Sequence, residues 1–187
     1  TPKRTLLLLK EATLLIFEED RHARPLLKQA GITRSYLKYN EHHQKETLDV
    51  LEEALKKGKT ALYISDQGSP TIADPGHALL QLTYRLKANV KVIPGPSSIT
   101  AAISACPFNL NSFVFVGFLP TKQALRQKKL YDYLNLKSPL VILETPYRRQ
   151  QLLQFLKTVP KLKKRNLFLA LDITGIREAY HVGSLTH

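Results

Sequence analysis

The sequence lacks methionine and tryptophan, and it has a single cysteine, Cys106, among its 187 residues. One cysteine excludes an internal disulfide framework and a thiolate metal cluster, and it suits a reducing cytoplasm. No set of His, Cys and carboxylate residues has metal-ligand spacing either. Because no initiator methionine is present, we expect the natural chain to be longer. The sequence predicts a cytoplasmic protein without a metal.

Long apolar runs are also absent. The early run from Leu6 to Leu9 stops at Lys10, well short of the ~20 apolar residues that a membrane helix needs. It is also too short for the core of a signal peptide. We therefore expect no membrane partner.

Acidic residues are scarce relative to basic ones. Asp and Glu total 15 against 28 Lys and Arg, which gives a formal net charge of +13. This excess favours an anionic partner and salt-sensitive association, but it also serves solubility in proteins that never bind nucleic acid. Hydrophobic residues make up 43% of the chain, enough to bury a core and to exclude disorder.

The first half of the chain alternates between helical and extended patterns. Strands are predicted at residues 13–17, 60–65 and 90–93, and helices at 3–12, 21–30, 46–57, 77–87 and 97–105. Gly31 and Gly58 stand where C-terminal caps are expected. This alternation predicts an α/β fold with a mainly parallel sheet.

The pattern changes after residue 112. Strands are predicted at 113–118, 139–144, 168–172 and 180–185, and helices at 122–133 and 149–158. We expect a boundary near residue 109, with an N-terminal domain at 1–109 and a smaller C-terminal α/β domain at 110–187.

Two loops between a predicted strand and a predicted helix are candidates for ligand binding. The first is Ser-Asp-Gln-Gly-Ser-Pro-Thr-Ile-Ala-Asp-Pro-Gly at 65–76, and the second is Ile-Pro-Gly-Pro-Ser-Ser at 93–98. Small molecules bind beyond the carboxyl ends of strands in open parallel sheets, and Gly68 lets backbone approach a ligand. The same residue types also dominate ordinary turns, and Ser97 or Ser98 is also suited to capping a helix.

Both loops resemble the cofactor loops of the tetrapyrrole methylase superfamily. Four further segments resemble its ribosomal RNA small subunit methyltransferase I branch: Glu-Asp-Arg-His-Ala-Arg at 19–24, Tyr-Asn-Glu-His-His at 39–43, Gly-Phe-Leu-Pro at 117–120 and Glu-Thr-Pro-Tyr-Arg at 144–148. The branch also opens with a strand and a Pro-Thr-Pro loop, of which at most Thr1-Pro2 remains. Together with Ala105-Cys106-Pro107, where a small residue and glycine are expected, this indicates a divergent, shorter subgroup.

The resemblance implies a two-domain tetrapyrrole methylase fold, with helices on both faces of the N-terminal sheet and a cofactor cleft between the domains. It also implies a homodimer that binds S-adenosyl-L-methionine, releases S-adenosyl-L-homocysteine, and methylates a ribose 2′-hydroxyl, of cytidine, in small-subunit ribosomal RNA. The cofactor-binding residues that it implies are Ser65, Asp66, Gly68, Ser69, Pro70, Pro94, Gly95, Pro96, Ser97, Glu144, Thr145 and Pro146.

Methyl transfer to a hydroxyl needs the acceptor held close to the methyl group and a route for its proton. Glu19, Asp20, His22 and His42 are the catalytic candidates. The competing interpretation is that Glu19 and Asp20 form a solvated strand end and that His42 is simply exposed.

Several basic and aromatic residues are candidates for RNA contact. Guanidinium groups bind phosphate in fixed geometry, so Arg21, Arg24 and Arg148 are predicted to bind substrate, with Tyr147. Tyr39 and Phe118 are further candidates for stacking on an unpaired base, although core packing is the favoured interpretation of Phe118. Charged runs would widen this surface or merely be solvated: Lys122, Arg126, Lys128, Lys129, Lys157, Lys161, Lys163, Lys164 and Arg165.

Three functions stay open at this point. The first is methylation of ribosomal RNA, with the ribosomal RNA or the small ribosomal subunit as partner. The second keeps the cofactor but methylates a tetrapyrrole or another small molecule. The third is an RNA-binding protein whose cofactor site has decayed.

Overall fold

The computed structural model describes residues 2–66 and 68–185. Gln67, a residue of the first loop motif, lies outside the described residues. The chain divides into two compact units, Thr1–Ser97 and Ser98–His187, and each unit is described by itself. The domain limits predicted from the sequence, 1–109 and 110–187, stay a prediction.

The first unit is built on a parallel sheet in the order β2-β1-β3. Its strands are β1 (Leu14–Phe17), β2 (Leu37–Lys38) and β3 (Ala61–Ile64), and its helices are α1 (Lys3–Glu11), α2 (Asp20–Gln29), α3 (Gln44–Lys56) and α4 (His77–Arg85). In register, Ile16 lies beside Leu37 on one neighbour and beside Tyr63 on the other. The predicted parallel sheet is confirmed.

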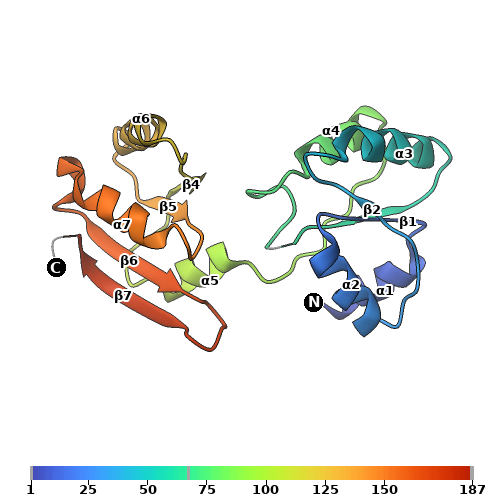
Figure 1. Ribbon diagram of the computed structural model, residues 1–187, viewed down its shortest axis with the longest axis horizontal. Helices are drawn as coiled ribbons and strands as arrows, with labels where there is room; N and C mark the ends of the chain where they lie inside the picture. Colours follow the sequence, from blue (N-terminus) through green and yellow to red (C-terminus); the bar gives the residue numbers. More distant parts are fainter. Residues whose placement is uncertain (1, 67, 186–187) are drawn as a thin grey trace. The chain divides into compact units, whose positions relative to one another are not determined.

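Helices cover both faces of this sheet, as Figure 1 shows. Leu15 and Phe17 of β1 pack with Leu9 of α1 and Leu27 of α2 on one face. Ile16 packs on the other face with residues of α3 and α4. Successive side chains of a strand point to opposite faces, so the apolar run 14–17 supplies both cores. Two layers of helices around the sheet therefore follow from one short strand.

The second unit contains two separate sheets. Strands β4 (Val114–Phe118) and β5 (Leu140–Leu143) pair in parallel, whereas β6 (Asn166–Leu171) and β7 (Ala179–Ser184) form an antiparallel hairpin. The helices are α5 (Ser98–Ala105), α6 (Gln123–Leu134), α7 (Arg149–Lys157) and the short 3-10 helix η1 (Pro160–Leu162). One core joins them, with Leu119, Leu130, Leu156 and Leu185 among its buried residues.

The predicted strand at 90–93 is wrong. In the described part of the chain these residues form no ladder with a neighbouring strand, and Val92 is 78% exposed. A short apolar run forms a strand only where a partner strand satisfies its backbone groups. The sequence also gave no signal for β2 or η1, whereas Gly31 and Gly58 end their helices at φ of 67° and 69° as predicted. No helix among the described residues is both long and apolar enough to cross a membrane.

The core of the second unit can be tested on α6, which carries both buried leucines and an exposed one. Leu130 is 0% exposed and Leu125 is 54% exposed. We expect Leu130→Ala to lower the free energy of unfolding by about 2–5 kcal/mol, because it leaves a cavity. Leu125→Ala is the matched control and should change it by less than about 0.5 kcal/mol. Urea unfolding followed by circular dichroism measures both, and equal losses would contradict the assigned core.

Candidate functional site

Polar residues follow all three strands of the first sheet. Glu18 and Glu19 come directly after β1, Asn40 comes two residues after β2, and Asp66 comes two residues after β3. Parallel strands place their carboxyl ends at one edge, which is where open α/β sheets bind ligands. We call these residues the carboxyl-edge cluster.

Hydrogen bonds join the members of the carboxyl-edge cluster across the sheet. The backbone N–H of Glu19 donates to Asp66 Oδ1 at 3.2 Å, and the backbone N–H of Asp66 donates to Glu18 Oε2 at 3.1 Å. Asn40 Nδ2 donates to Glu19 Oε1 at 3.0 Å. The loops after the three strands are therefore held together by side chains.

Asp66 faces two basic side chains of α2. Its Oδ2 lies 3.7 Å from His22 Nε2 and 4.0 Å from Arg21 Nε. The Asp66 side chain is only 8% exposed, whereas those of Arg21 and His22 are 74% and 41% exposed. The cluster thus presents a basic outer layer over a buried carboxylate.

Asp20 points into a different set of contacts. It accepts a hydrogen bond from the Tyr36 hydroxyl at 2.8 Å and lies within 3.4 Å of Arg24 Nη2 and 3.7 Å of Lys38 Nζ. The Tyr36 hydroxyl lowers the pKa of the Asp20 carboxyl, and Lys38 and Arg24 add to the effect. A carboxylate stabilised in this way is a weak proton acceptor.

The histidines after β2 are organised by Asn40, a residue that the sequence did not single out. Asn40 Oδ1 accepts hydrogen bonds from the backbone N–H groups of His42 and His43 at 3.1 and 3.2 Å, and it lies 2.8 Å from His43 Nδ1. The His42 side chain is exposed. The predicted His42 is therefore beside the cluster, while the ring that contacts it belongs to His43.

The loop after β3 is built around Asp74. Thr71 N and Gly76 N donate to Asp74 Oδ1 at 2.8 and 2.7 Å, and the Tyr63 hydroxyl donates to Oδ2 at 3.0 Å. Thr71 and Ala73 have φ of 68° and 58°, a left-handed conformation that costs free energy in residues other than glycine. Asp74 holds this strained path in place.

Tyr63 and Gly76 complete the support of the loop. Burial raises the pKa of Tyr63 far above its ordinary value, and Asp74 adds to the rise, so the hydroxyl stays protonated and remains a donor. A Cβ on Gly76 would lie 2.5 Å from Tyr63 Cε1, so only glycine fits there. Segment 68–76 is thus positioned by Asp74 from within and by Tyr63 of β3.

Glu18 is a further titratable residue of the cluster that the sequence did not indicate. Burial raises the pKa of its carboxyl; the N–H of Asp66 opposes this, and the charges of Asp66, Asp74 and Glu19 add to it. The folded protein therefore disfavours the ionised form of Glu18. No signal in the sequence separates it from Glu19, because only the folded sheet determines which carboxylate points inward.

Glycine backbone is accessible in both predicted cofactor loops. Gly68 has φ of 68° and no heavy atom within 4 Å of the position that a Cβ would take. At Gly95, the nearest atom to an added Cβ is Pro2 Cγ at 3.7 Å. The remaining predicted residues of these loops are exposed or half-buried: Ser65, Ser69, Pro70, Pro94, Pro96 and Ser97. This open backbone fits a small molecule held through main-chain groups.

In the second unit the loop after β4 is held by cations. Four consecutive carbonyl groups accept hydrogen bonds: Phe118 O from Lys129, Leu119 O from Arg148, and Pro120 O and Thr121 O from Arg126. Arg126 is 4% exposed and lies over the Phe155 ring at 5.4 Å. Its predicted place on the basic surface is therefore wrong.

The predicted residues after β5 form a second small cluster. Glu144 Oε2 lies 3.3 Å from Arg148 Nη2, and Glu144 Oε1 accepts from Thr145 N at 2.8 Å. Pro146 and Tyr147 are exposed, Tyr147 at 84%. Arg148, by contrast, directs its guanidinium at Glu144 and Leu119. Tyr39 is fully buried and cannot stack on a base, whereas Phe118 is 41% exposed.

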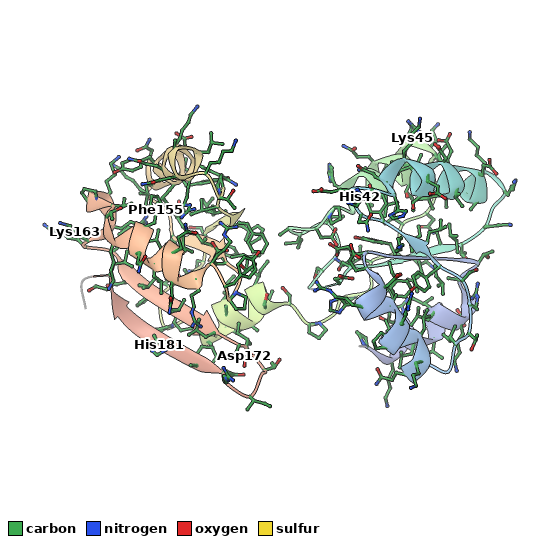
Figure 2. The ribbon with its side chains drawn as sticks, in the orientation of Figure 1. His42, Lys45, Phe155, Lys163, Asp172 and His181 are labelled. Carbon is green, nitrogen blue, oxygen red and sulfur yellow. The ribbon has the colours of Figure 1, made fainter. Side chains whose placement is uncertain are left out.

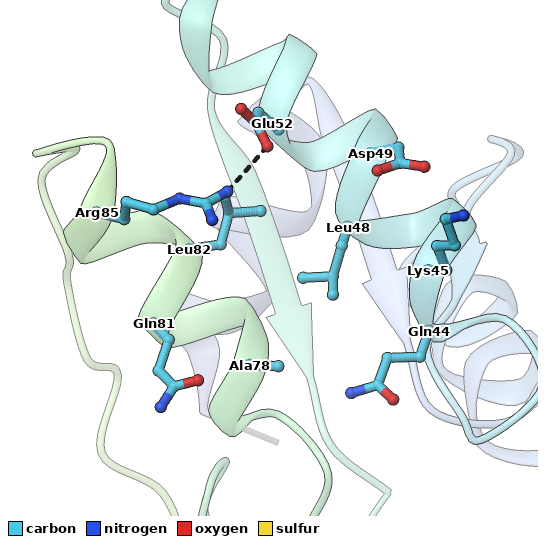
Figure 3. Close-up of a pocket in the computed structure, with 9 residues that line it drawn as sticks. All are labelled: Gln44, Lys45, Leu48, Asp49, Glu52, Ala78, Gln81, Leu82 and Arg85. Carbon is cyan, nitrogen blue, oxygen red and sulfur yellow. Dashed lines mark hydrogen bonds and ion pairs between the residues drawn. The ribbon is translucent and has the colours of Figure 1, made fainter.

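A groove of 480 Å³ lies between α3 and α4, as Figure 3 shows. Leu48, Ala78 and Leu82 line it, and Arg85 Nη2 and Glu52 Oε2 pair across it at 3.0 Å. It contains none of the predicted site residues. Within the described ranges, no group of three or more His, Cys, Asp and Glu side chains is placed to hold a metal ion.

Comparison with known proteins decides the family. Residues 2–186 match the family described as Tetrapyrrole (Corrin/Porphyrin) Methylases. The chain belongs to the tetrapyrrole methylase family. The predicted tetrapyrrole methylase fold is confirmed as well: cobalt precorrin-4 methyltransferase, a solved structure, matches 99% of this chain and 80% of its own with a TM-score of 0.65 at 15% identity.

Two relatives align with almost the whole length of this tetrapyrrole methylase. Ribosomal RNA small subunit methyltransferase I of Thermotoga maritima is 30% identical over 98% of this chain and 81% of its own length. The protein of the same name from Leptospira borgpetersenii is 34% identical over 95% of this chain and 71% of its own.

Asp74 provides a test of how the loop is held. We expect Asp74→Ala to lower the free energy of unfolding by about 1–3 kcal/mol, because three donors lose a charged acceptor, and to speed proteolysis within residues 70–76. Asp49→Ala, an exposed carboxylate of α3, is the control. Thermal unfolding and limited proteolysis measure both effects. An Asp74→Ala loop as resistant as the wild type would show that Asp74 does not hold it.

The raised pKa of Glu18 predicts that the wild type and a Glu18→Gln variant differ in stability by an amount that depends on pH. Because its pKa is raised in the folded protein, the folded state binds the proton more tightly than the unfolded state, and stability falls as pH rises from about 4.5 through the raised value. Glu18→Gln keeps the acceptor for Asp66 N and removes the charge. We expect it to melt higher than the wild type by about 1–3 °C at pH 7.

The difference in melting temperature between Glu18→Gln and the wild type should vanish below the ordinary glutamate pKa of 4.5, where Glu18 is protonated in both the folded and the unfolded protein. Glu41→Gln, at an exposed position, should show no such trend. Melting curves between pH 4 and pH 8 measure it, and a lower melting temperature for Glu18→Gln at pH 7 would refute the assignment.

Proposed function

We propose that this chain is an S-adenosylmethionine-dependent methyltransferase that methylates a ribose 2′-hydroxyl of small-subunit ribosomal RNA. The observation that carries the proposal is the relatedness, over nearly the whole chain, to proteins named ribosomal RNA small subunit methyltransferase I. The net charge of +13 supports a polyanionic substrate.

The proposed cofactor residues lie in the two open loops of the first unit and in the loop after β5. Gly68 and Gly95 leave room for a ligand against their backbone, and Asp66 and Asp74 fix the path of the first loop. S-Adenosylmethionine, when bound, supplies the methyl group. Glu144, Thr145 and Pro146 are proposed to contribute from the second unit.

The proposed proton acceptor is His22 or Glu19. Glu19 belongs to the carboxyl-edge cluster, and His22 contacts that cluster through Asp66. Asp20 is less suited, because Tyr36, Lys38 and Arg24 stabilise its ionised form. We assign Asp20 a positioning role and leave the exposed His42 as an alternative acceptor.

The proposed substrate contacts are Arg21, Arg24 and Tyr147, whose side chains are exposed. Exposed guanidinium groups suit phosphate oxygens, and an exposed aromatic ring suits a splayed base. Arg148 is proposed to act by holding the loops after β4 and β5 together. A homodimer stays a prediction of the family resemblance.

Gly95→Val separates cofactor binding from folding. An added Cβ meets no atom nearer than 3.7 Å, so the variant should fold and melt as the wild type does. If backbone at Gly95 contacts the cofactor, the bulky side chain should weaken S-adenosylmethionine binding by at least about ten-fold, about 1.4 kcal/mol. Calorimetric titration with S-adenosylmethionine and S-adenosylhomocysteine measures this, with Gly183→Val as the control at another open glycine.

The same proteins then test the activity. The wild type should transfer a labelled methyl group to small-subunit ribosomal RNA, naked or assembled, and Gly95→Val should do so poorly. Preferential transfer to a corrinoid precursor would favour the tetrapyrrole alternative. RNA binding with no cofactor affinity in the wild type would favour the decayed site.

A further inference from the structure

Positive charge is distributed unevenly between the two units. Residues 98–187 contain 13 Lys and Arg against 4 Asp and Glu, and residues 145–171 contain seven basic residues and no acidic one. The second unit therefore carries nine of the thirteen net positive charges. A basic excess that is concentrated in one unit indicates a local surface rather than a general aid to solubility.

The ion pairs show the same asymmetry. Seven of the eight in the described parts of the chain lie within the first unit. Among residues 98–185 the only one joins Glu144 to Arg148. In the described part of the first unit six Lys and Arg side chains thus have an acidic partner, whereas in that of the second unit only Arg148 has one.

Two turns of the second unit bring several of these lysines onto one surface. Lys161 Nζ donates to Asn135 Oδ1 at 3.0 Å and lies 5.4 Å from the centre of the Tyr131 ring. Arg165 Nη2 donates to Ser138 O at 2.8 Å. The turn after α6 and the turn at 161–165, which begins within η1, are therefore fastened together at both ends.

Lysines stand between these two attachment points on each turn. Lys137 lies between Asn135 and Ser138, and Lys163 and Lys164 lie between Lys161 and Arg165. All of these lysines are exposed, and Figure 2 shows the Lys163 side chain extending away from the body of its unit. We call Lys137, Lys161, Lys163 and Lys164 the double-turn patch.

We infer that the double-turn patch is a phosphate-contacting surface for RNA. The inference rests on the proposed function and adds to it a contact surface that belongs to neither cofactor loop. Four exposed ammonium groups on two fastened turns bind a phosphate backbone by releasing its counterions, with no need for a particular base. The patch would position RNA, while other residues select the nucleotide.

The test compares two variants, one that loses three charges from the double-turn patch and one that loses three charges from the first unit. The patch variant is Lys137→Gln/Lys163→Gln/Lys164→Gln, which spares Lys161 because its contacts fasten the turns. The matched control is Lys10→Gln/Lys28→Gln/Lys59→Gln, at exposed positions of the first unit. Both lower the net charge equally. Binding of a small-subunit ribosomal RNA fragment is measured by fluorescence anisotropy at several potassium chloride concentrations.

We expect the patch variant to bind RNA about ten-fold more weakly near 0.15 M salt and to lose about 2 from the slope of log affinity against log salt, because each phosphate contact contributes somewhat less than one to that slope. The control should stay within about two-fold of the wild type. Equal losses in both variants would overturn the inference, and so would unchanged binding by the patch variant.

A separate measurement isolates the proposed function. Calorimetric titration with S-adenosylmethionine should give the same affinity for the wild type and both variants, which shows that they are folded. RNA binding through the patch without methyl transfer by the wild type would refute the proposed function and leave the surface standing. Absence of RNA binding, with patch-dependent binding of polyglutamate, would overturn the inference in favour of an acidic protein partner.

Discussion

The pairing of β1 with a parallel neighbour on each side is the constraint on which the first unit depends. It buries Leu15, Ile16 and Phe17 between two layers of helices. It also brings the residues after all three strands to one edge. Once that edge exists, the hydrogen bonds among Glu18, Glu19, Asn40 and Asp66 follow from proximity. The carboxyl-edge cluster is thus a consequence of strand order, and the side chains of the cluster in turn lock the loops that the strand order has brought together.

Much of this architecture could be predicted because the signals are local. The apolar runs at 14–17 and 61–64 and the glycines after α2 and α3 each act on their own neighbourhood. The strand predicted at 90–93 and the unpredicted β2 show the limit, because pairing depends on partners distant in sequence. Leu37–Lys38 forms a strand because β1 is beside it, whereas the more apolar residues 90–93 have no such neighbour among the described residues.

The candidate site, like the fold, could be predicted where local motifs identify the residues. Loop motifs identified Asp66, Gly68 and Gly95, and the family resemblance joined them to a methyl donor. Asn40 and Asp74 stand within the quoted motifs. The supporting roles of these two residues and of Glu18 could not be predicted, since each role depends on which way the side chain points. Arg126 is the clearest case: in a run of lysines it has the pattern of a solvated face, yet its guanidinium is buried against Pro120 O and Thr121 O.

The loop after β4 differs from the carboxyl-edge cluster in the groups that hold it. Its carbonyls are bound by the cationic side chains of Arg126, Arg148 and Lys129. The first unit instead holds its loops with carboxylates, since Asp66 and Asp74 accept hydrogen bonds from backbone N–H groups. The two units therefore order their loops with charges of opposite sign: anionic side chains gather backbone donors in one, and cationic side chains gather backbone acceptors in the other.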